Sequence, residues 1–359
     1  MRPVVAIFGG GLAGHRLAHR LQHDMNVHLV DPRNYFEVPM AAPRMLVDPS
    51  LARRAVIPFS EFLPKVTHHA QRLVTLREGQ AILVGDGGQT SELTFDVAVL
   101  ATGSSWRDAR VRGGASTAAL RRQQVEAEAE ALAKAEHIVI AGGGPVGVEI
   151  AAELASVGRG AAVRLVHGGP RLLDMLPPRA GRQARRYLVD RGVTVCLEQT
   201  VRDHTPGTVM SSSGEVWSCE AFFEAWGSTQ HAAALLDEAL SDARGAQGRV
   251  KVDAMLRVAG SSTIFAVGDI IDSAEARQGQ AAGLQVDVVV KNLQAVASGR
   301  AAQATYCPTS GASPMLVTLG PRHGTGFVPW LGPVVPMLTT WMKSRDMMVG
   351  RYRRGVGLV

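Results

Sequence analysis

Residues 3–31 read PVVAIFGGGLAGHRLAHRLQHDMNVHLVD, and this stretch decides the fold. The apolar run at 3–8 predicts a buried strand, and the residues after the glycines are spaced as on a helix. The segment VHLVD at 27–31 predicts a second strand, which ends in an acid. A strand, a glycine loop, a helix and a second strand within about thirty residues form a dinucleotide-binding βαβ unit.

Each glycine of the motif Gly-x-Gly-x-x-Gly has a separate task in such a unit. The first permits a tight turn, the second lets the backbone approach a pyrophosphate, and the third allows the helix to pack close to the strand. The helix N-terminus adds N–H donors, and the acid after the second strand can accept hydrogen bonds from an adenosine ribose. A glycine turn before a helix also occurs without a nucleotide, so the flanking strands and the acid support the prediction. The predicted cofactor contacts of this unit are Gly9, Gly11, Leu12, Ala13, Gly14 and Asp31.

The same pattern returns later in the chain. HIVIAGGGPVGVEIAAELA at 137–155 is again a strand, a glycine loop and a helix, and AAVRLVH at 161–167 is again a strand. A further apolar strand follows each unit, FDVAVLATG at 95–103 and AFFEAWG at 221–227, and STIFAVGD at 262–269 adds one that ends in Gly-Asp. This internal repeat predicts an α/β protein with two Rossmann-like dinucleotide-binding domains and a small C-terminal segment.

The second loop differs from the first at the end of its second strand. His167 stands there in place of an acid, and Arg171 follows closely. An acid favours NADH and repels a 2′-phosphate, whereas histidine and arginine tolerate or attract it, so both NADH and NADPH are expected as donors. The alternative is that His167 merely caps the strand. The predicted contacts of the second unit are Gly142, Gly144, Pro145, Val146, Gly147, His167, Arg171 and Gly227.

Glu149 lies in the first turn of the helix after the second loop. An acid at a helix N-terminus complements the helix dipole, and this alone would justify it. The alternative is a catalytic role, in which the carboxylate faces the nicotinamide side of the cleft. Spacing does not separate these interpretations, and we retain Glu149 as a candidate catalytic residue.

Composition narrows the class of protein. The chain has 359 residues and a formal net charge of +6. Because 46% of its residues are hydrophobic, it can bury full cores, and this excludes global disorder. The three cysteines, Cys196, Cys219 and Cys307, are far apart, so neither a disulfide framework nor a metal site is expected. No motif of nucleic-acid recognition accompanies the charge. The start leaves no room for a signal peptide, and no apolar run is long enough to span a bilayer, so a cytoplasmic location is expected.

Four pieces occur in order along the chain: the first loop with its acid, an Ala-Thr-Gly turn, the second loop with its glutamate, and a strand that ends in Gly-Asp. That order resembles the flavoprotein family with two dinucleotide-binding domains, which includes glutathione reductase, ferredoxin reductases and type II NADH dehydrogenases. The resemblance covers about residues 1–300. It implies that the first unit and the Gly-Asp strand end bind FAD and that the second loop binds NADH or NADPH. The further cofactor contacts that it predicts are Ala101, Thr102, Gly103, Gly268 and Asp269.

The resemblance also implies a division of the chain. Residues 1–108 and 249–305 would form a split FAD-binding domain, and 109–248 an inserted NAD(P)H-binding domain. Residues 306–359 would form a C-terminal segment that covers the flavin and the acceptor site. One departure from the family pattern is Trp226, which can change how the nicotinamide cleft closes.

The segment after the first unit, NYFEVPMAAPRM at 34–45, contains no cysteine. Disulfide reductases of the family carry a cysteine pair there. A thiol shuttle is therefore excluded, and so is sulfide:quinone chemistry of the usual cysteine-dependent kind.

Three short motifs resemble those of the apoptosis-inducing-factor-like branch, which includes the ferroptosis suppressor proteins. They are YFE at 35–37, AAPR at 41–44 and KSRDMMV at 343–349. The branch implies an NAD(P)H:quinone oxidoreductase in which Arg44 contacts the cofactor and Lys343 lies beside the isoalloxazine and the quinone. Met348 replaces the usual phenylalanine of the last motif, which puts the packing of the quinone there in doubt.

An apolar cluster lies directly before the basic end of the chain. Apolar side chains next to lysines and arginines are typical of a segment that lies on an anionic membrane, here expected on the inner face. The alternative is that the cluster packs over the flavin or forms a dimer contact. Its members are Trp330, Leu331, Val334, Val335, Met337, Leu338, Trp341 and Met342.

These observations predict a hydride transfer from NADH or NADPH to FAD, followed by transfer of two electrons to a quinone-like acceptor. Lys343 would stabilise the negative charge that develops there. Two alternatives are a tailoring oxidoreductase of specialised metabolism with a soluble substrate and a ferredoxin reductase with an acidic protein partner. A non-catalytic NAD(P)H-sensing protein is a third.

Overall fold

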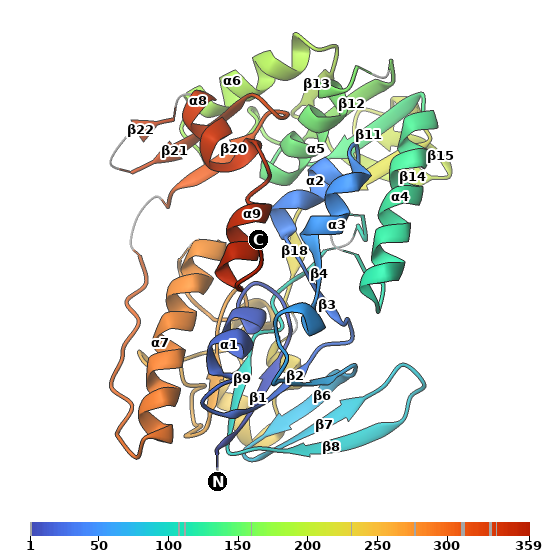
Figure 1. The fold of residues 1–359 in the computed structure, drawn as a ribbon. Coiled ribbons are helices and arrows are strands. Elements are labelled where there is room, and N and C mark those ends of the chain that lie inside the picture. Colours follow the sequence, from blue (N-terminus) through green and yellow to red (C-terminus); the bar gives the residue numbers. More distant parts are fainter. Residues whose placement is uncertain are drawn as a thin grey trace.

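The computed structural model describes residues 2–106, 108–110, 113–158, 160–230, 232–275, 278–309, 313–329, 332–334 and 336–359. Its lower half in Figure 1 is built on a parallel sheet of five strands. Helices α1 (Gly14–Leu21) and α7 (Gly279–Ala297) pack beside each other there. The strands are, in spatial order, β19 (Ile264–Ala266), β9 (Val97–Leu100), β1 (Val4–Phe8), β2 (Asn26–Val30) and β5 (Thr67–His69).

The upper half repeats this construction. Helix α5 (Pro145–Ser156) follows the first strand of its sheet, and α6 (Pro178–Val189) packs against α5 (Figure 1). All pairs of neighbouring strands are parallel. The strands are, in spatial order, β13 (Thr194–Leu197), β12 (Ala162–His167), β11 (His137–Ala141) and β17 (Ala221–Glu224). The predicted α/β class with two Rossmann-like units is confirmed.

The two units correspond beyond the loop and helix. In the first unit, an antiparallel sheet of three strands comes before β9, which pairs with β1. In the second unit, an antiparallel sheet of three strands comes before β17, which pairs with β11. The six inserted strands are β6 (Arg72–Arg77), β7 (Gln80–Val84), β8 (Thr90–Thr94), β14 (Val201–Thr205), β15 (Gly207–Ser211) and β16 (Val216–Cys219).

Shorter elements join the units. Strand β10 (Ser105–Trp106) pairs antiparallel with β18 (Ser228–Thr229), so the chain is hydrogen-bonded where it passes from one half to the other. Helix α4 (Ala118–Lys134) follows β10, and its first turn is capped by the Thr117 hydroxyl, which accepts from the Leu120 N–H. The remaining elements of the first unit are β3 (Tyr35–Glu37), α2 (Ala42–Met45), α3 (Ala52–Ala55), β4 (Val56–Pro58) and 3-10 turns at Pro39–Ala41, Pro49–Leu51 and Phe59–Glu61. Further 3-10 turns lie at Ala232–Leu235, Glu238–Ala243 and Ala246–Gly248.

The C-terminal segment contacts both halves. Val317 and Leu319 belong to the core of the upper sheet, whereas Val349 and Val356 belong to the core of the lower sheet. In Figure 1 the red helix α9 lies where the two halves meet. The elements of this segment are β20 (Met315–Thr318), β21 (Gly324–Val328), β22 (Gly332–Pro333), α8 (Pro336–Thr339), a π-helix at Thr340–Ser344 and α9 (Val349–Gly355).

Packing crosses the predicted domain boundaries at several places, since Ala118 and Val125 of α4 also belong to the core of the lower sheet. Leu46 and Val47 belong to the core of the upper sheet, and the chain returns to the lower core at Ala232, ahead of residue 249. The boundaries themselves stay a prediction. Among the described helices, none has both the length and the apolar character needed to cross a bilayer.

Candidate active site

The first glycine loop is closed tightly against strand β9. Gly9 has a φ of +104°, and a Cβ on it would lie 2.5 Å from the carbonyl oxygen of Ala101. A Cβ on Gly14 would collide with the carbonyl oxygen of Gly9, because the helix begins directly beneath the strand end. Both positions therefore need glycine, and they leave the backbone open to a phosphate at the start of α1.

Asp31 is tied to this loop. Its Oδ2 accepts from the Gly10 N–H at 2.7 Å, and its Oδ1 accepts from the Arg33 N–H at 2.9 Å and from Nε of Arg33 at 3.1 Å. Burial alone would raise the pKa of Asp31, but the charge and hydrogen bonds of Arg33 outweigh it and leave this pKa lowered. The carboxylate therefore stays ionised, as an acceptor for ribose hydroxyls requires.

His15, directly after the third glycine, is the most unusual residue of the first loop. Its ring is buried, stacks on Phe36 with centroids 3.8 Å apart, and lies with Nδ1 2.6 Å from the carbonyl oxygen of Gly11. Burial lowers the pKa of His15 to about 3, so the ring is neutral and Nδ1 donates to this carbonyl. Sequence reasoning missed this residue, because histidine at helical spacing is read as a polar surface position.

The second loop has the same backbone geometry. Gly142 has a φ of +122°, and a Cβ there would collide with the carbonyl oxygen of Ala225; a Cβ on Gly147 would collide with that of Gly142. His167 takes the place that Asp31 has in the first loop, since its Nδ1 accepts from the Gly143 N–H at 3.2 Å. That contact leaves the proton on Nε2, which is buried and has no hydrogen-bond partner among the described residues.

Arg171 is not free to swing toward a ligand. Its guanidinium donates to the carbonyl oxygen of Leu176 at 2.7 Å and also to those of Leu173 and Asp174. The Leu173 N–H in turn donates to the Gly143 carbonyl at 2.9 Å. Arg171 therefore stabilises the turn that supports the second loop, and direct contact with a cofactor stays a prediction.

The remaining predicted cofactor contacts gather at the carboxyl ends of β1, β9 and β19. The Gly268 N–H donates to Gln285 at 2.6 Å, and Asp269 accepts from the Ser104 hydroxyl at 3.0 Å. The carboxyl edge of a parallel sheet is where such folds bind ligands. Gly103 and Gly268 both have positive φ, and a Cβ on either would meet open space, so this edge is accessible. Its residues fit an extended dinucleotide that runs from the first loop to Asp269.

Lys343 and Glu149, the two predicted catalytic residues, form an ion pair. Glu149 lies in the second turn of α5, which begins at Pro145, and not in the first turn as expected. The Nζ of Lys343 lies 2.7 Å from Oε1 of Glu149, although the residues are 194 positions apart. Nζ also donates to the Leu316 carbonyl at 2.9 Å, and Oε1 accepts from the Thr318 N–H at 2.8 Å. Glu149 is buried and the Lys343 side chain is 13% exposed, so the ion pair is largely shielded from water.

Arg44 lies beside this pair but contacts other partners. Its Nε and Nη2 bind the two carboxylate oxygens of Glu153 at 2.5 and 2.8 Å, and Nη2 also donates to the Ser344 carbonyl at 3.1 Å. Sequence reasoning missed Glu153. A signal existed, because Glu149 and Glu153 are one helical turn apart and share one face of α5.

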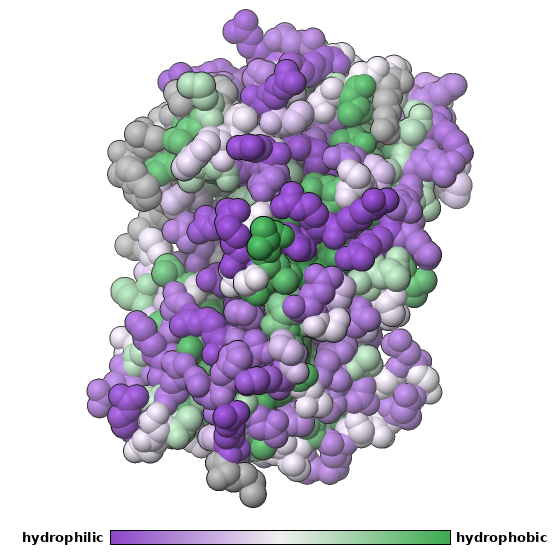
Figure 2. Space-filling view, in the orientation of Figure 1, coloured by the Kyte–Doolittle hydropathy of each residue, from purple (hydrophilic) through white to green (hydrophobic). Residues whose placement is uncertain are grey.

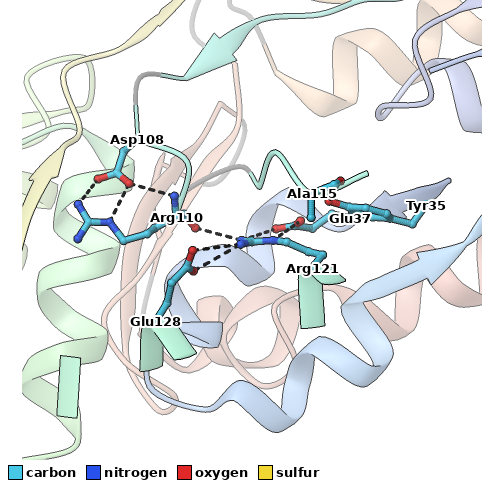
Figure 3. A network of polar contacts seen from close by, with 7 residues as sticks. All are labelled: Tyr35, Glu37, Asp108, Arg110, Ala115, Arg121 and Glu128. Atoms are coloured by element: carbon cyan, nitrogen blue, oxygen red, sulfur yellow. Dashed lines mark hydrogen bonds and ion pairs between the residues drawn. The ribbon is translucent and has the colours of Figure 1, made fainter. Parts of the chain in front are cut away.

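A second buried network, shown in Figure 3, was also missed. Arg121 of α4 is 1% exposed, binds both carboxylate oxygens of Glu37 at 3.0 and 3.3 Å, and donates to the Arg110 carbonyl. Arg110 pairs with Asp108 and lies over the ring of Phe223 in the upper sheet, 4.0 Å from its centroid. The network joins the YFE motif to the edge of the second unit.

Tyr35 lies at the right-hand side of the same network in Figure 3. Its hydroxyl donates to the Ala115 carbonyl at 3.1 Å, and burial raises its pKa to about 12 (Figure 3). Tyr35 and Glu37 therefore hold the connection between the two halves, and this supplies a structural reason for the YFE motif.

The space beside Gly227, at the end of β17, is open. Gly227 has a φ of +114°, and a Cβ there would meet nothing within 4 Å. Trp226 is partly exposed and packs edge-on against Phe222, with centroids 5.9 Å apart. Its effect on closure of the cleft stays a prediction.

The apolar cluster of the C-terminal segment divides between surface and interior. Met337 and Trp341 are 82% and 76% exposed, Met342 is exposed as well, and Val334 is buried. Figure 2 shows hydrophobic side chains over α8 and β21, on a face that is otherwise mainly hydrophilic. Three predicted members, Trp330, Leu331 and Val335, lie outside the described residues.

Comparison with known proteins identifies the family. The model of the pyridine nucleotide-disulphide oxidoreductases matches residues 3–292. The chain belongs to this family. All three cysteines of this family member are free, so it carries no disulfide of its own.

Relatives of this pyridine nucleotide oxidoreductase cover most or nearly all of its length. Ferroptosis suppressor protein 1 of Xenopus tropicalis is 28% identical over 372 residues, which cover 98% of this chain and 96% of that protein. The FAD-dependent oxidoreductase FVFD30 of Flammulina velutipes is 30% identical over 284 residues, 77% of this chain and 85% of that protein. Among solved structures, the sulfide:quinone oxidoreductase of Aquifex aeolicus has a TM-score of 0.73 at 16% identity and covers 99% of this chain and 91% of its own. The predicted relation to the ferroptosis suppressor branch is confirmed.

Proposed function

We propose that this oxidoreductase passes a hydride from NADH or NADPH to FAD and then two electrons to a quinone-type acceptor, without a redox-active disulfide. The observation that carries the proposal is the buried Lys343–Glu149 pair, which joins the C-terminal segment to the helix of the second loop. Bound FAD would supply the hydride-accepting and electron-donating chemistry.

The residues divide the binding work between the two loops. The first loop and Asp31 would hold the ADP half of FAD, and Gly268 and Asp269 its flavin side, within a domain of residues 1–108 and 249–305. The second loop would hold the nicotinamide nucleotide within 109–248. Support comes from the two glycine cradles, in which side chains are excluded at Gly9, Gly14, Gly142 and Gly147.

Lys343 is suited to stabilise negative charge at the acceptor. An ammonium group has three N–H donors, and the described contacts, to Glu149 and the Leu316 carbonyl, use two of them. The third is available to a ligand oxygen. Because Glu149 holds the charge in a fixed place with little water, no reorganisation is needed when negative charge develops nearby.

The proposed quinone acceptor is supported by the residues at 34–45 and by similarity to known proteins. The segment at 34–45 has no thiol to relay electrons, so the acceptor must approach the flavin directly. Similarity to ferroptosis suppressor protein 1 over nearly the full length, and to the fold of a sulfide:quinone oxidoreductase, supports a quinone. Residues 306–359 would cover this site.

The surface of the C-terminal segment supports peripheral contact with a membrane. Exposed Met337 and Trp341 are followed by the exposed cations Arg345, Arg351 and Arg354. We expect vesicles that contain anionic lipid to bind the protein, and the double variant Met337→Ser/Trp341→Ser to lose most of this binding while its turnover with a water-soluble quinone is kept. Equal sedimentation of both proteins with the vesicles would contradict this part of the proposal.

Anaerobic stopped-flow spectroscopy tests the proposed reaction. The flavin absorbance near 450 nm is followed while the protein is reduced by NADH or NADPH and then mixed with a short-chain ubiquinone. Fast bleaching and fast recovery are expected. Fast bleaching without recovery would move the acceptor to a soluble metabolite or a protein, and absence of bound flavin would refute the proposal.

A further inference from the structure

Three segments that are far apart in the sequence meet at Arg44. This residue lies on α2 next to the first unit, Glu153 lies on α5 of the second unit, and Ser344 belongs to the C-terminal segment. The guanidinium donates hydrogen bonds to both carboxylate oxygens of Glu153 and to the carbonyl oxygen of Ser344. Its planar fork can satisfy three acceptors at fixed angles, which a lysine cannot do.

These contacts of Arg44 with Glu153 and Ser344, called here the Arg44 joint, lie one residue from Lys343. Ser344 is fixed a second time, because its hydroxyl donates to the His323 carbonyl at 3.0 Å. On α5, Glu153 follows Glu149 by one helical turn. Glu149 accepts from Lys343 directly, whereas Glu153 is linked to the neighbouring Ser344 through Arg44. The position of the ammonium group therefore depends on the backbone that Arg44 holds.

The Arg44 joint is also buried. Glu153 is fully buried and Arg44 is 9% exposed. Burial raises the pKa of Glu153, and the guanidinium of Arg44 opposes this effect. Removal of one partner would leave a buried charge without compensation, whereas replacement of both by apolar side chains removes the link to Ser344 without that penalty.

We propose that Arg44 is a positioning residue, which holds Lys343 against Glu149 by fixing Ser344 to α5 and so connects the placement of this ammonium group to the packing of both nucleotide-binding units. The role for Lys343 itself rests on the proposed function. The positioning does not require a bound cofactor, and it is therefore measurable in the flavin-free protein as well as in the loaded one.

The reactivity of the Lys343 amine tests this directly. Purified protein, with flavin bound and after its removal, is treated briefly with an amine-reactive ester, and labelling of each lysine is followed by mass spectrometry. In Arg44→Met we expect labelling of Lys343 to rise about tenfold, with exposed Lys134 as the internal reference. Arg44→Lys should give an intermediate rise, because it keeps the charge and loses the fork.

Two further variants keep the test decisive. Arg44→Met/Glu153→Leu removes both charges, so it guards against misfolding caused by an unpaired carboxylate, and it should release Lys343 equally. Arg121→Met is the matched control, because it breaks another buried pair, with Glu37, that has no contact with the C-terminal segment among the described residues. There the protection of Lys343 should persist.

The outcomes separate this inference from the proposed function. Unchanged labelling of Lys343 in Arg44→Met and in the double variant would overturn the positioning role, whatever their activity. A rise in labelling together with a loss of quinone turnover, but not of flavin reduction, supports both. A rise in labelling with full quinone turnover supports the positioning role and contradicts the function proposed for Lys343.

Discussion

The two glycine loops have nearly the same backbone and different side chains. Gly9 and Gly142 both have positive φ, and each faces the carbonyl oxygen at the end of a neighbouring strand. The residue after the third glycine is buried His15 in the first loop and buried Val148 in the second. The side chain that receives the N–H of the middle glycine is Asp31 in one and His167 in the other. The glycines thus build a cradle for a pyrophosphate, and the other side chains determine which nucleotide it takes.

Substitution of the third glycine of either loop should have the largest effect on cofactor binding. It should also distinguish the role of the first loop from that of the second. In Gly14→Ala the new Cβ collides with the Gly9 carbonyl, and we expect loss of most bound flavin, together with several kcal/mol of stability. In Gly147→Ala the equivalent collision lies in the second loop, so flavin should remain while the KM for NAD(P)H rises about tenfold or more. Flavin content and KM are the measurements. Loss of flavin in Gly147→Ala alone would invert the assignment of the loops.

The buried histidine should make the first unit sensitive to acid. The pKa of His15 is about 3 in the folded protein and about 6.5 when unfolded, so the unfolded chain binds more protons between these values. The contribution of His15 to the free energy of unfolding is therefore independent of pH above about pH 6.5. It falls by about 1.4 kcal/mol per pH unit as the pH decreases from there toward 3. Urea unfolding at pH 7.5 and pH 5 should show a loss of about 2 kcal/mol in the wild type.

The variant His15→Leu isolates this effect. The substitution removes a hydrogen bond to Gly11, so its stability at pH 7.5 should be lower. Its stability should nevertheless fall less between pH 7.5 and pH 5 than that of the wild type. The same pH dependence in both proteins would assign the acid sensitivity to other groups.

The smallest effect on nucleotide binding is expected at His167, the last residue of β12 in the second unit. An acid at position 167 would repel the 2′-phosphate of NADPH, as Asp31 would in the first unit. His167→Asp should raise the KM for NADPH about tenfold and change that for NADH much less. Equal changes for both donors would mean that His167 only supports the loop through Gly143.

Local pattern was sufficient to predict the strands of both parallel sheets and both glycine loops, because glycine spacing and strand length are properties of neighbouring residues. The contact between Lys343 and Glu149 was not predictable, since it depends on where the chain runs after β20. Arg121 was missed because the charged helix α4 resembles a solvated one, and only the structure shows that Glu37 meets it. Of the predicted C-terminal cluster, Val334 is buried and Trp341 is exposed. The reason is that Val334 follows β22 and its N–H donates to the Gly326 carbonyl of β21, whereas Trp341 lies on the π-helix at Thr340–Ser344.

The most direct test of the account is the variant Lys343→Ala in anaerobic stopped-flow experiments, with flavin content measured on the same samples. We predict that reoxidation of the reduced protein by a short-chain ubiquinone slows about tenfold or more, while flavin content stays near that of the wild type, since the cradles do not involve this residue. Equal losses of flavin and of quinone-driven reoxidation would contradict the central claim, because Lys343 would then support the fold and not the acceptor.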